Sequence, residues 1–127
     1  MSRLNIRNNR FFMNFFKDNI NLIDVKFPII DFHKFLWFYR MFYGCKKIQY
    51  IDISSVYNDN GEYFYDMFRG CKSLEVLYLP DFNKGCLTCS KDNMFLDVPK
   101  NATIVINKNF YNSVKDQLTD FINVYDI

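Results

Sequence analysis

Two cysteines, Cys86 and Cys89, have the spacing Cys-x-x-Cys, which in other proteins forms a redox pair or half of a zinc site. A structural zinc site needs about four ligands. The sequence offers neither a second such pair nor a nearby histidine, because His33 is the only histidine of the chain. We therefore predict no metal and no cofactor, and a redox or metal role of Cys86 and Cys89 remains the alternative.

Other patterns that indicate catalysis are missing from the sequence. It contains no phosphate-binding glycine loop, no nucleophile elbow and no clustered acid and base. His33 has no second histidine and no obvious group of carboxylates to work with. The sequence therefore predicts a protein that is not an enzyme, so that its function must lie on a surface.

One stretch of the chain occurs twice. The segment MFYGCKKIQYIDIS, from Met41 to Ser54, returns as MFRGCKSLEVLYLP, from Met67 to Pro80. Met, Phe, Gly, Cys and Lys recur identically, and the isoleucines of the first copy become leucines in the second. A fixed period of this size is typical of a solenoid, in which each unit packs its apolar face on the next.

Each unit is expected to contain one short strand and one helix. Strands are predicted at about 50–54, at 76–79 and within NATIVIN at 101–107, and helices at about 32–43 and 62–71. Because side chains alternate along a strand, Ile51, Leu77 and Ile104 are expected to point inward. In the same layer Cys45 and Cys71 would pack as small apolar residues.

The segment INLIDV is interpreted as a degenerate first copy of IQYIDI. When Met13 is aligned with Met41, Ile23 falls on Ile51, pointing inward, and Asp24 falls on Asp52. Neighbouring parallel strands lie about 4.8 Å apart. The alignment therefore predicts two carboxylates side by side on the outer face of the sheet.

Both ends of the chain are expected to be helices that cap the array, as such folds require. A basic amphipathic helix is predicted at about 9–18, with a basic face formed by Arg7, Arg10 and Lys17, and a second helix at 108–123. The predicted fold is α/β, a short solenoid with a small parallel sheet and one helix per repeat. Its single domain, residues 1–127, comprises an N-terminal cap helix (1–19), repeats (20–106) and a C-terminal cap helix (107–127).

The motif Met-Phe-x-x-Cys-x-x-Leu-x-x-Leu-x-Leu, with YIDIS and a period near 26, resembles the BspA-type leucine-rich repeats, also described as mycoplasma-type lipoprotein repeats. The resemblance covers roughly residues 13–106. PKNATIVI also resembles the run that often closes such arrays. The resemblance implies about four leucine-rich repeats with one short strand each, in a surface-recognition protein or adhesin without catalysis.

The outward-facing residues of the expected sheet are the predicted site for a protein partner. Apolar and tyrosine side chains in adjacent rows on an open sheet are typical of interaction surfaces. An excursion or a cap that covers the sheet is the structural alternative. The predicted binding residues are Leu22, Asp24, Tyr50, Asp52, Val76, Tyr78 and Val105.

The chain is expected to be cytoplasmic. Its beginning carries no secretion signal, and its longest apolar run there falls short of the roughly 20 residues of a membrane span. A net charge of +2 implies no particular partner. The high content of Asn, Ile and Lys is typical of an AT-rich genome.

We interpret the sequence as a small intracellular binding protein of unknown oligomeric state. Small proteins from AT-rich genomes are often carried by phages or mobile elements, and this association favours a role in inhibiting the protein partner. The first alternative is a surface-recognition protein or a fragment of one. The second is a nucleic-acid binder that uses the basic face of the first helix.

Overall fold

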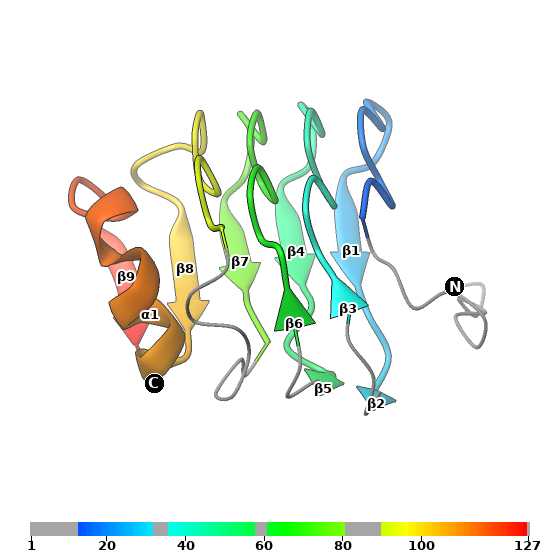
Figure 1. Cartoon of the computed structure of the whole chain (residues 1–127). Coiled ribbons are helices and arrows are strands. Elements are labelled where there is room, and N and C mark those ends of the chain that lie inside the picture. Colours follow the sequence, from blue (N-terminus) through cyan, green and yellow to red (C-terminus); the bar gives the residue numbers. More distant parts are fainter. Residues whose placement is uncertain (1–12, 32–35, 58–60, 81–89, 127) are drawn as a thin grey trace.

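The chain winds as a solenoid, and each circuit contributes one strand to a five-stranded parallel sheet (Figure 1). We call each circuit a coil and number the coils in chain order, so that the first contains residues 24–26 of the sheet and the last contains residues 123–126. The computed structural model describes residues 13–31, 36–57, 61–80 and 90–126. In spatial order the strands are β1 Asp24–Lys26, β4 Tyr50–Asp52, β7 Val76–Tyr78, β8 Thr103–Ile106 and β9 Asn123–Asp126.

The remaining elements are short. Strand β2 Ile30–Asp31 pairs with β5 Val56–Tyr57, and β3 Leu36–Trp37 pairs with β6 Gly61–Glu62. One α-helix, α1 Lys108–Val114, is followed by the 3-10 helix η1 Lys115–Gln117 in the part of the chain that the structure describes. Most of the fold is therefore strand and turn.

The register of the central strands confirms the predicted inward row. Ile51 pairs with Leu77, Leu77 pairs with Ile104, and all three side chains are buried. In the first coil, however, Val25 pairs with Ile51, and Ile23 is 40% exposed. The predicted alignment of the first coil is therefore wrong, since Val25 and not Ile23 occupies the inward position. A strand repeats its faces at every second residue, so the apolar pattern alone could not separate the two alignments.

The predicted helix of each repeat is wrong. Residues 13–18, 39–44, 65–70 and 92–97 form turns. An α-helix joins each N–H to the carbonyl four residues earlier. Here the N–H of Phe42 donates to the carbonyl of Met67 at 2.9 Å, and that of Phe68 donates to the carbonyl of Met94 at 3.0 Å. The turns thus form a second hydrogen-bonded ladder between coils, opposite the sheet.

Residues with positive φ explain why these segments do not form helices. Apart from Tyr63, which has φ of 55° and precedes its turn segment, they lie in two columns across the coils: Asn14, Arg40, Asp66 and Asn93 in one column and Asp18, Gly44, Gly70 and Asp97 in the other. A left-handed residue at every fourth position interrupts a right-handed helix, and Gly, Asn and Asp adopt this conformation most readily. A Cβ atom on Gly44 would also overlap the carboxylate of Asp18. Glycine at this position therefore serves both the turn and the close approach of the coils.

The predicted capping helices are also wrong. Residues 13–18 of the predicted first helix are turns, and residues 1–12 lie outside the described residues. The second predicted helix, 108–123, ends as an α-helix at Val114, and after η1 the chain returns to the sheet as β9. The α/β solenoid with one helix per repeat is therefore replaced by a stack of strand-and-turn coils. That residues 1–127 form a single domain stays a prediction.

Side chains of α1 and η1 contact the two coils that precede the last one, those of β7 and β8. Phe110 of α1 contacts the ring of Phe64, with centroids 5.0 Å apart. The side-chain amide of Gln117 donates to the carbonyl of Lys91 at 2.6 Å and accepts from the N–H of Met94 at 2.9 Å. The C-terminal segment is thus part of the stack.

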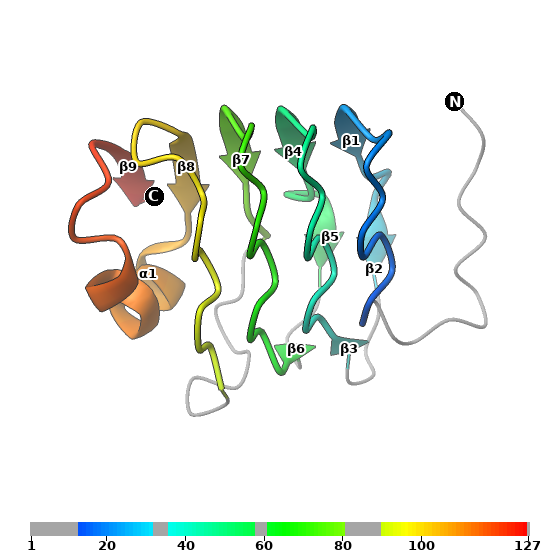
Figure 2. The ribbon, with the colours of Figure 1, turned by 90° about the horizontal axis from the view of Figure 1, so that it is seen from above.

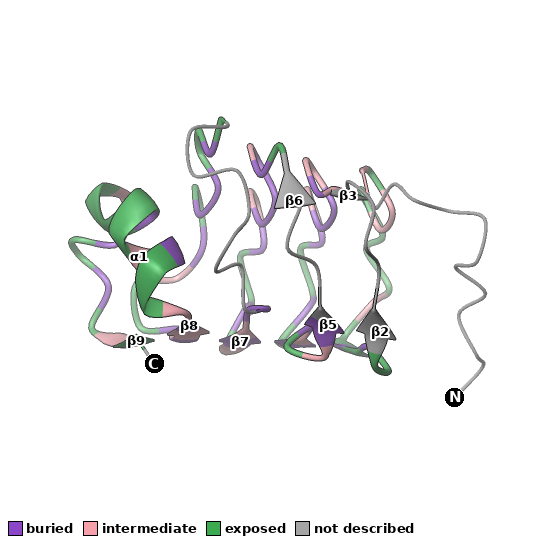
Figure 3. Ribbon diagram, turned by 60° about the horizontal axis from the view of Figure 1, so that its bottom comes forward, coloured by how far each residue is buried: buried purple, intermediate pink, exposed green. Residues whose placement is uncertain are grey.

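The core lies between the sheet and the turns, and it repeats from coil to coil. Figure 3 shows that buried residues recur on the strands and on the turns alike. On the turn side Phe16, Phe42, Phe68 and Phe95 form a column of rings, with successive centroids 5.3, 5.7 and 5.9 Å apart. On the sheet side the matching column is aliphatic. This core holds the sheet against the turns and leaves its other face outward.

Candidate protein-binding surface

The outer face of the five-stranded sheet carries two rows of side chains. The first row is Asp24, Tyr50, Val76, Thr103 and Asn123, and the second row is Lys26, Asp52, Tyr78, Val105 and Tyr125. In Figure 2 the other labelled strands and α1 all lie on the inner side of this sheet. Among the described elements, none covers the outer face.

Most of the predicted binding residues lie together on this face. Tyr50 and Val76 are neighbours in the first row, and Asp52, Tyr78 and Val105 are neighbours in the second row, as predicted. Two further residues, Asp24 and Leu22, differ from the prediction. Asp24 lies opposite Tyr50 and not opposite Asp52. Leu22 precedes β1 and packs partly buried against the core.

The predicted pair of facing carboxylates is therefore wrong. Lys26 stands opposite Asp52, so that unlike charges occupy this position of the two strands. One oxygen of Asp52 accepts hydrogen bonds from the backbone N–H of Ser54 at 3.0 Å and from its hydroxyl at 2.5 Å. Asp52 is thus held by its own turn, at the end of β4.

Two tyrosines form the centre of the outer face. The rings of Tyr50 and Tyr78 have centroids 6.1 Å apart and planes tilted by 58°, and both side chains are half-buried. Loss of hydration, followed by the negative charge of Asp52, raises the pKa of the Tyr50 hydroxyl above its ordinary value. The hydroxyl is therefore neutral at physiological pH and can donate a hydrogen bond.

The predicted basic face is only partly described. Lys17 is exposed, and its Nζ lies 5.7 Å from the centroid of the Tyr43 ring. Arg7 and Arg10 lie outside the described residues. The helix that was expected to carry all three is turn at Lys17. Nucleic-acid binding through these residues stays a prediction.

The buried cysteines fill space in the core. The thiol of Cys45 donates to the carbonyl of Phe16 at 3.1 Å, and that of Cys71 donates to the carbonyl of Phe42 at 3.3 Å. Burial raises the pKa of Cys45 to about 11 and raises that of Cys71 as well. Both thiols are therefore protonated and unreactive near neutral pH.

The pair Cys86 and Cys89 lies outside the described residues, so its role stays a prediction. In the described ranges no three His, Cys, Asp or Glu side chains come together as a metal site would require. The same ranges contain no helix with the length and apolar character needed to cross a membrane.

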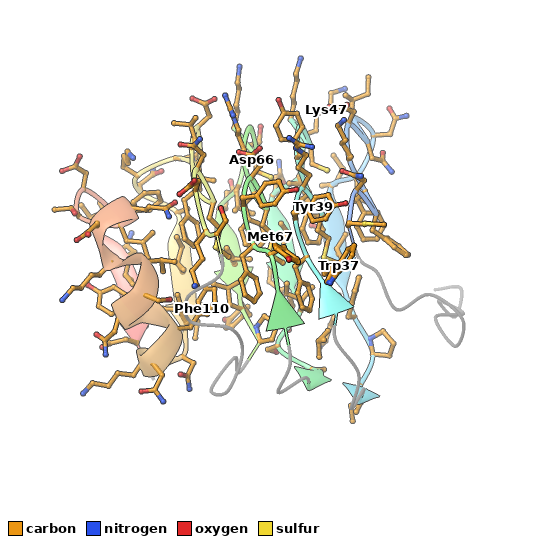
Figure 4. The ribbon with its side chains drawn as sticks, viewed as in Figure 1. Trp37, Tyr39, Lys47, Asp66, Met67 and Phe110 are labelled. Atoms are coloured by element: carbon orange, nitrogen blue, oxygen red, sulfur yellow. The ribbon has the colours of Figure 1, made fainter. Side chains whose placement is uncertain are left out.

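A second group of side chains at the surface, most of them half-buried, lies on the turn side and was not predicted from the sequence. We call it the turn-side cluster, and it comprises Trp37, Tyr39, Arg40, Tyr43, Tyr63, Tyr65, Asp66 and Arg69. In Figure 4 Trp37 and Tyr39 lie on the side of the molecule opposite the sheet. The rings of Tyr39 and Tyr65 stack with centroids 4.8 Å apart, and Trp37 contacts Tyr63 edge to face at 5.5 Å. The sequence signal was present, since WFY at 37–39 returns as YFY at 63–65.

Asp66 holds the charged part of the turn-side cluster together. Its carboxylate is 3.4 Å from Nε of Arg40 and 3.4 Å from Nη1 of Arg69. Asp66 is only 8% exposed. The two guanidinium groups in turn lie over Tyr65 and Tyr43. Because the aromatic faces are occupied by one another and by arginine, the cluster is built mainly from contacts within the chain.

The fold and the outer face define a repeat protein with an exposed parallel sheet. No protein-family model, curated protein or solved structure matched the chain. The resemblance to the BspA-type leucine-rich repeats therefore stays a prediction.

Proposed function

We propose that the chain is a non-enzymatic binding protein whose protein partner docks on the outer face of the sheet. The observation that supports this proposal is the half-buried pair of Tyr50 and Tyr78 on a face that no described element covers. Tyrosines offer a large contact area with a polar tip and are enriched among the residues that dominate binding energy. Inhibition of the partner is the role that we propose for this contact.

The charges around the tyrosines indicate what the partner presents. Tyr50 lies between Asp24, its neighbour on β1, and Asp52, two residues further along β4. An arginine of the partner could stack on the Tyr50 ring while it pairs with either carboxylate. We therefore propose a partner surface in which Arg or Lys side chains border an apolar area.

The test is a binding measurement with variants of the outer face. The partner is captured from the native cell with the parent protein, identified by mass spectrometry and purified. Replacing Tyr50, Tyr78 and Asp52 by Ala should then weaken the complex by more than about 2 kcal/mol, roughly 30-fold in Kd. Unchanged circular dichroism and urea unfolding establish that the triple variant is folded.

Tyr63→Ala is the matched control, because Tyr63 is an exposed tyrosine that directly follows β6, and β6 lies on the side of the molecule opposite the sheet (Figure 2). It should bind the partner as tightly as the parent. If the triple variant binds with unchanged affinity, the outer face is not the site. If Tyr63→Ala weakens binding while the triple variant does not, the partner uses the turn-side cluster.

A further inference from the structure

Strand β9 leaves one of its edges open. All four of its residues pair with β8, and no described strand pairs with its other edge. Proteins usually protect an edge strand with charges, proline or a bulge, because its free N–H and C=O groups can pair with another chain. At the opposite edge of the sheet β1 carries the exposed charges Asp24 and Lys26. In β9 only Asp126 is charged.

The open edge lies beside a cavity that is lined by both polar and apolar residues. A cavity of about 460 Å³ lies beside β9, with Tyr111, Leu118, Phe121 and Val124 among the residues that line it. Ile122, at the mouth of this cavity, is 73% exposed. Tyr125, on the outer face of β9, is 56% exposed. An unpaired strand edge with exposed apolar and aromatic side chains beside it is suited to an added strand, whose backbone pairs with the edge and whose side chains cover these residues.

The end of the stack limits how a second chain can join it. The hydrogen bonds of the turn side run as far as Leu96, whose carbonyl accepts from the N–H of Gly70. Next to β9 the chain forms α1 instead of another turn segment (Figure 1). A further coil added in parallel would therefore lack its turn-side ladder and could use the strand edge alone.

We propose that two copies of the chain pair through their β9 strands in antiparallel orientation, about a twofold axis perpendicular to the sheet. Such an interface uses the same surface of both copies and closes as a dimer. An axis in this direction keeps inward residues inward and outward residues outward. With Val124 opposite its own symmetry mate, Asn123 lies opposite Tyr125, and both of these residues face outward.

This register is complementary in chemistry as well as in geometry. The two Val124 side chains meet beside the cavities of both copies. The Asn123 amide lies beside the Tyr125 ring and hydroxyl of the other copy. Lys115 and Asp116 both line the cavity, so that each copy brings one positive and one negative charge to this end of the stack. The pairing is independent of the proposed partner, which uses Tyr50 and Tyr78 on the outer face.

The first experiment is analytical ultracentrifugation of the full chain over a range of concentrations. We expect the parent to dimerise reversibly and the double variant Asn123→Lys, Tyr125→Lys to stay monomeric. The matched control Tyr63→Lys, on the turn side, should dimerise like the parent. A parent that is monomeric at every concentration, or that forms open-ended polymers, would overturn the proposal.

The second experiment tests the register by disulfide trapping in a background with Cys86→Ser and Cys89→Ser. Opposed residues of antiparallel strands have Cα atoms about 4.5–5.5 Å apart, within the range of a disulfide. Val124→Cys should therefore cross-link to itself. Tyr125→Cys alone should not, but it should cross-link when mixed with Asn123→Cys. Cross-linking of Tyr125→Cys to itself, with none in the mixture, would show that β9 does not pair in this register.

Discussion

The two sides of the stack bond neighbouring coils in different ways. On the sheet side, strands of three or four residues pair in the ordinary parallel pattern. On the turn side, the N–H of Gly44 donates to the carbonyl of Arg69 at 2.9 Å, and the N–H of Gly70 donates to the carbonyl of Leu96 at 2.9 Å. On the turn side, residues with left-handed backbone conformation at regular intervals direct the N–H and C=O groups toward the neighbouring coils. Bonds between coils can thus replace the bonds within a helix.

The sheet side and the turn side also differ in the types of side chain that they carry. The inward column of the sheet is aliphatic, and the inward column of the turns consists of stacked phenylalanine rings. Outward, the sheet presents tyrosines beside carboxylates, and the turns present tyrosines beside arginines. We expect the turn side to contribute more to stability, because large rings are packed there, and the sheet side to contribute more to binding.

The largest effect should come from removing one core side chain on each side. Phe68 is fully buried between Phe42 and Phe95, and Leu77 is fully buried between Ile51 and Ile104. We expect Phe68→Ala to lower the free energy of unfolding by about 4 kcal/mol and Leu77→Ala by about 3 kcal/mol. Urea unfolding, with a common m-value, measures both. A smaller loss for Phe68→Ala than for Leu77→Ala would contradict the ranking of the two sides.

The three central strands could be predicted from the sequence because their pattern is specific. Alternating apolar residues, repeated after a fixed period, leave one inward row for the central strands, and Ile51, Leu77 and Ile104 form it. The first coil was misaligned because Ile23 and Val25 have the same parity in the strand, and either fits the alternation. The turn side contained the information that decides between them, because Phe16 precedes Phe42 by the same interval as Phe42 precedes Phe68.

The turn side could not be predicted because it imitates a helix. Its buried residues in the second coil are Phe38, Met41, Phe42 and Cys45, which have the i, i+3, i+4, i+7 spacing of a helix face. Two consecutive tight turns place side chains at the same intervals. In the second coil Gly44 is the one residue of the two columns whose type favours positive φ, since the other is Arg40. A helix over this segment would not place Trp37 and Tyr39 beside their counterparts Tyr63 and Tyr65, so the helical pattern does not predict the turn-side cluster.

The second prediction concerns the reactivity of Cys45, which is buried on the turn side. Burial raises the pKa of Cys45 to about 11, from 9.0 for an ordinary thiol. A raised pKa keeps the thiol protonated, and only the thiolate reacts with alkylating agents. At about pH 9 roughly half of an unfolded thiol is ionised, but only about 1% of Cys45 in the folded protein.

Alkylation at that pH, in a background with Cys86→Ser and Cys89→Ser, should therefore be about fiftyfold slower for Cys45 in the folded chain than in urea. The modified residue is identified by mass spectrometry. The rate should rise as the pH approaches 11, because the folded thiol then ionises. Equal rates in the folded and unfolded protein at pH 9 would mean that the turn side opens readily.

The smallest effect concerns a single residue whose backbone and side chain have opposing preferences. Arg40 has φ of 53°, in a column whose other members are Asn14, Asp66 and Asn93. Arginine adopts this conformation at a cost of roughly 1 kcal/mol, and this cost is much smaller for Asn and Asp. Against this cost, Arg40 pairs with Asp66 and lies over Tyr65. Its side chain is 41% exposed, so the ion pair contributes only about 0.5 kcal/mol.

Replacing Arg40 by Asn removes the ion pair and the ring contact but also relieves the backbone. The two effects nearly cancel, so Arg40→Asn should change the free energy of unfolding by less than about 0.5 kcal/mol. Arg40→Ala removes the same contacts but keeps the cost of positive φ, because alanine also disfavours this conformation. Arg40→Ala should therefore be less stable than Arg40→Asn by about 1 kcal/mol. Urea unfolding of the two variants measures this difference. Equal stabilities would mean that the backbone at residue 40 is not left-handed, and that the two-column account of the turns fails there.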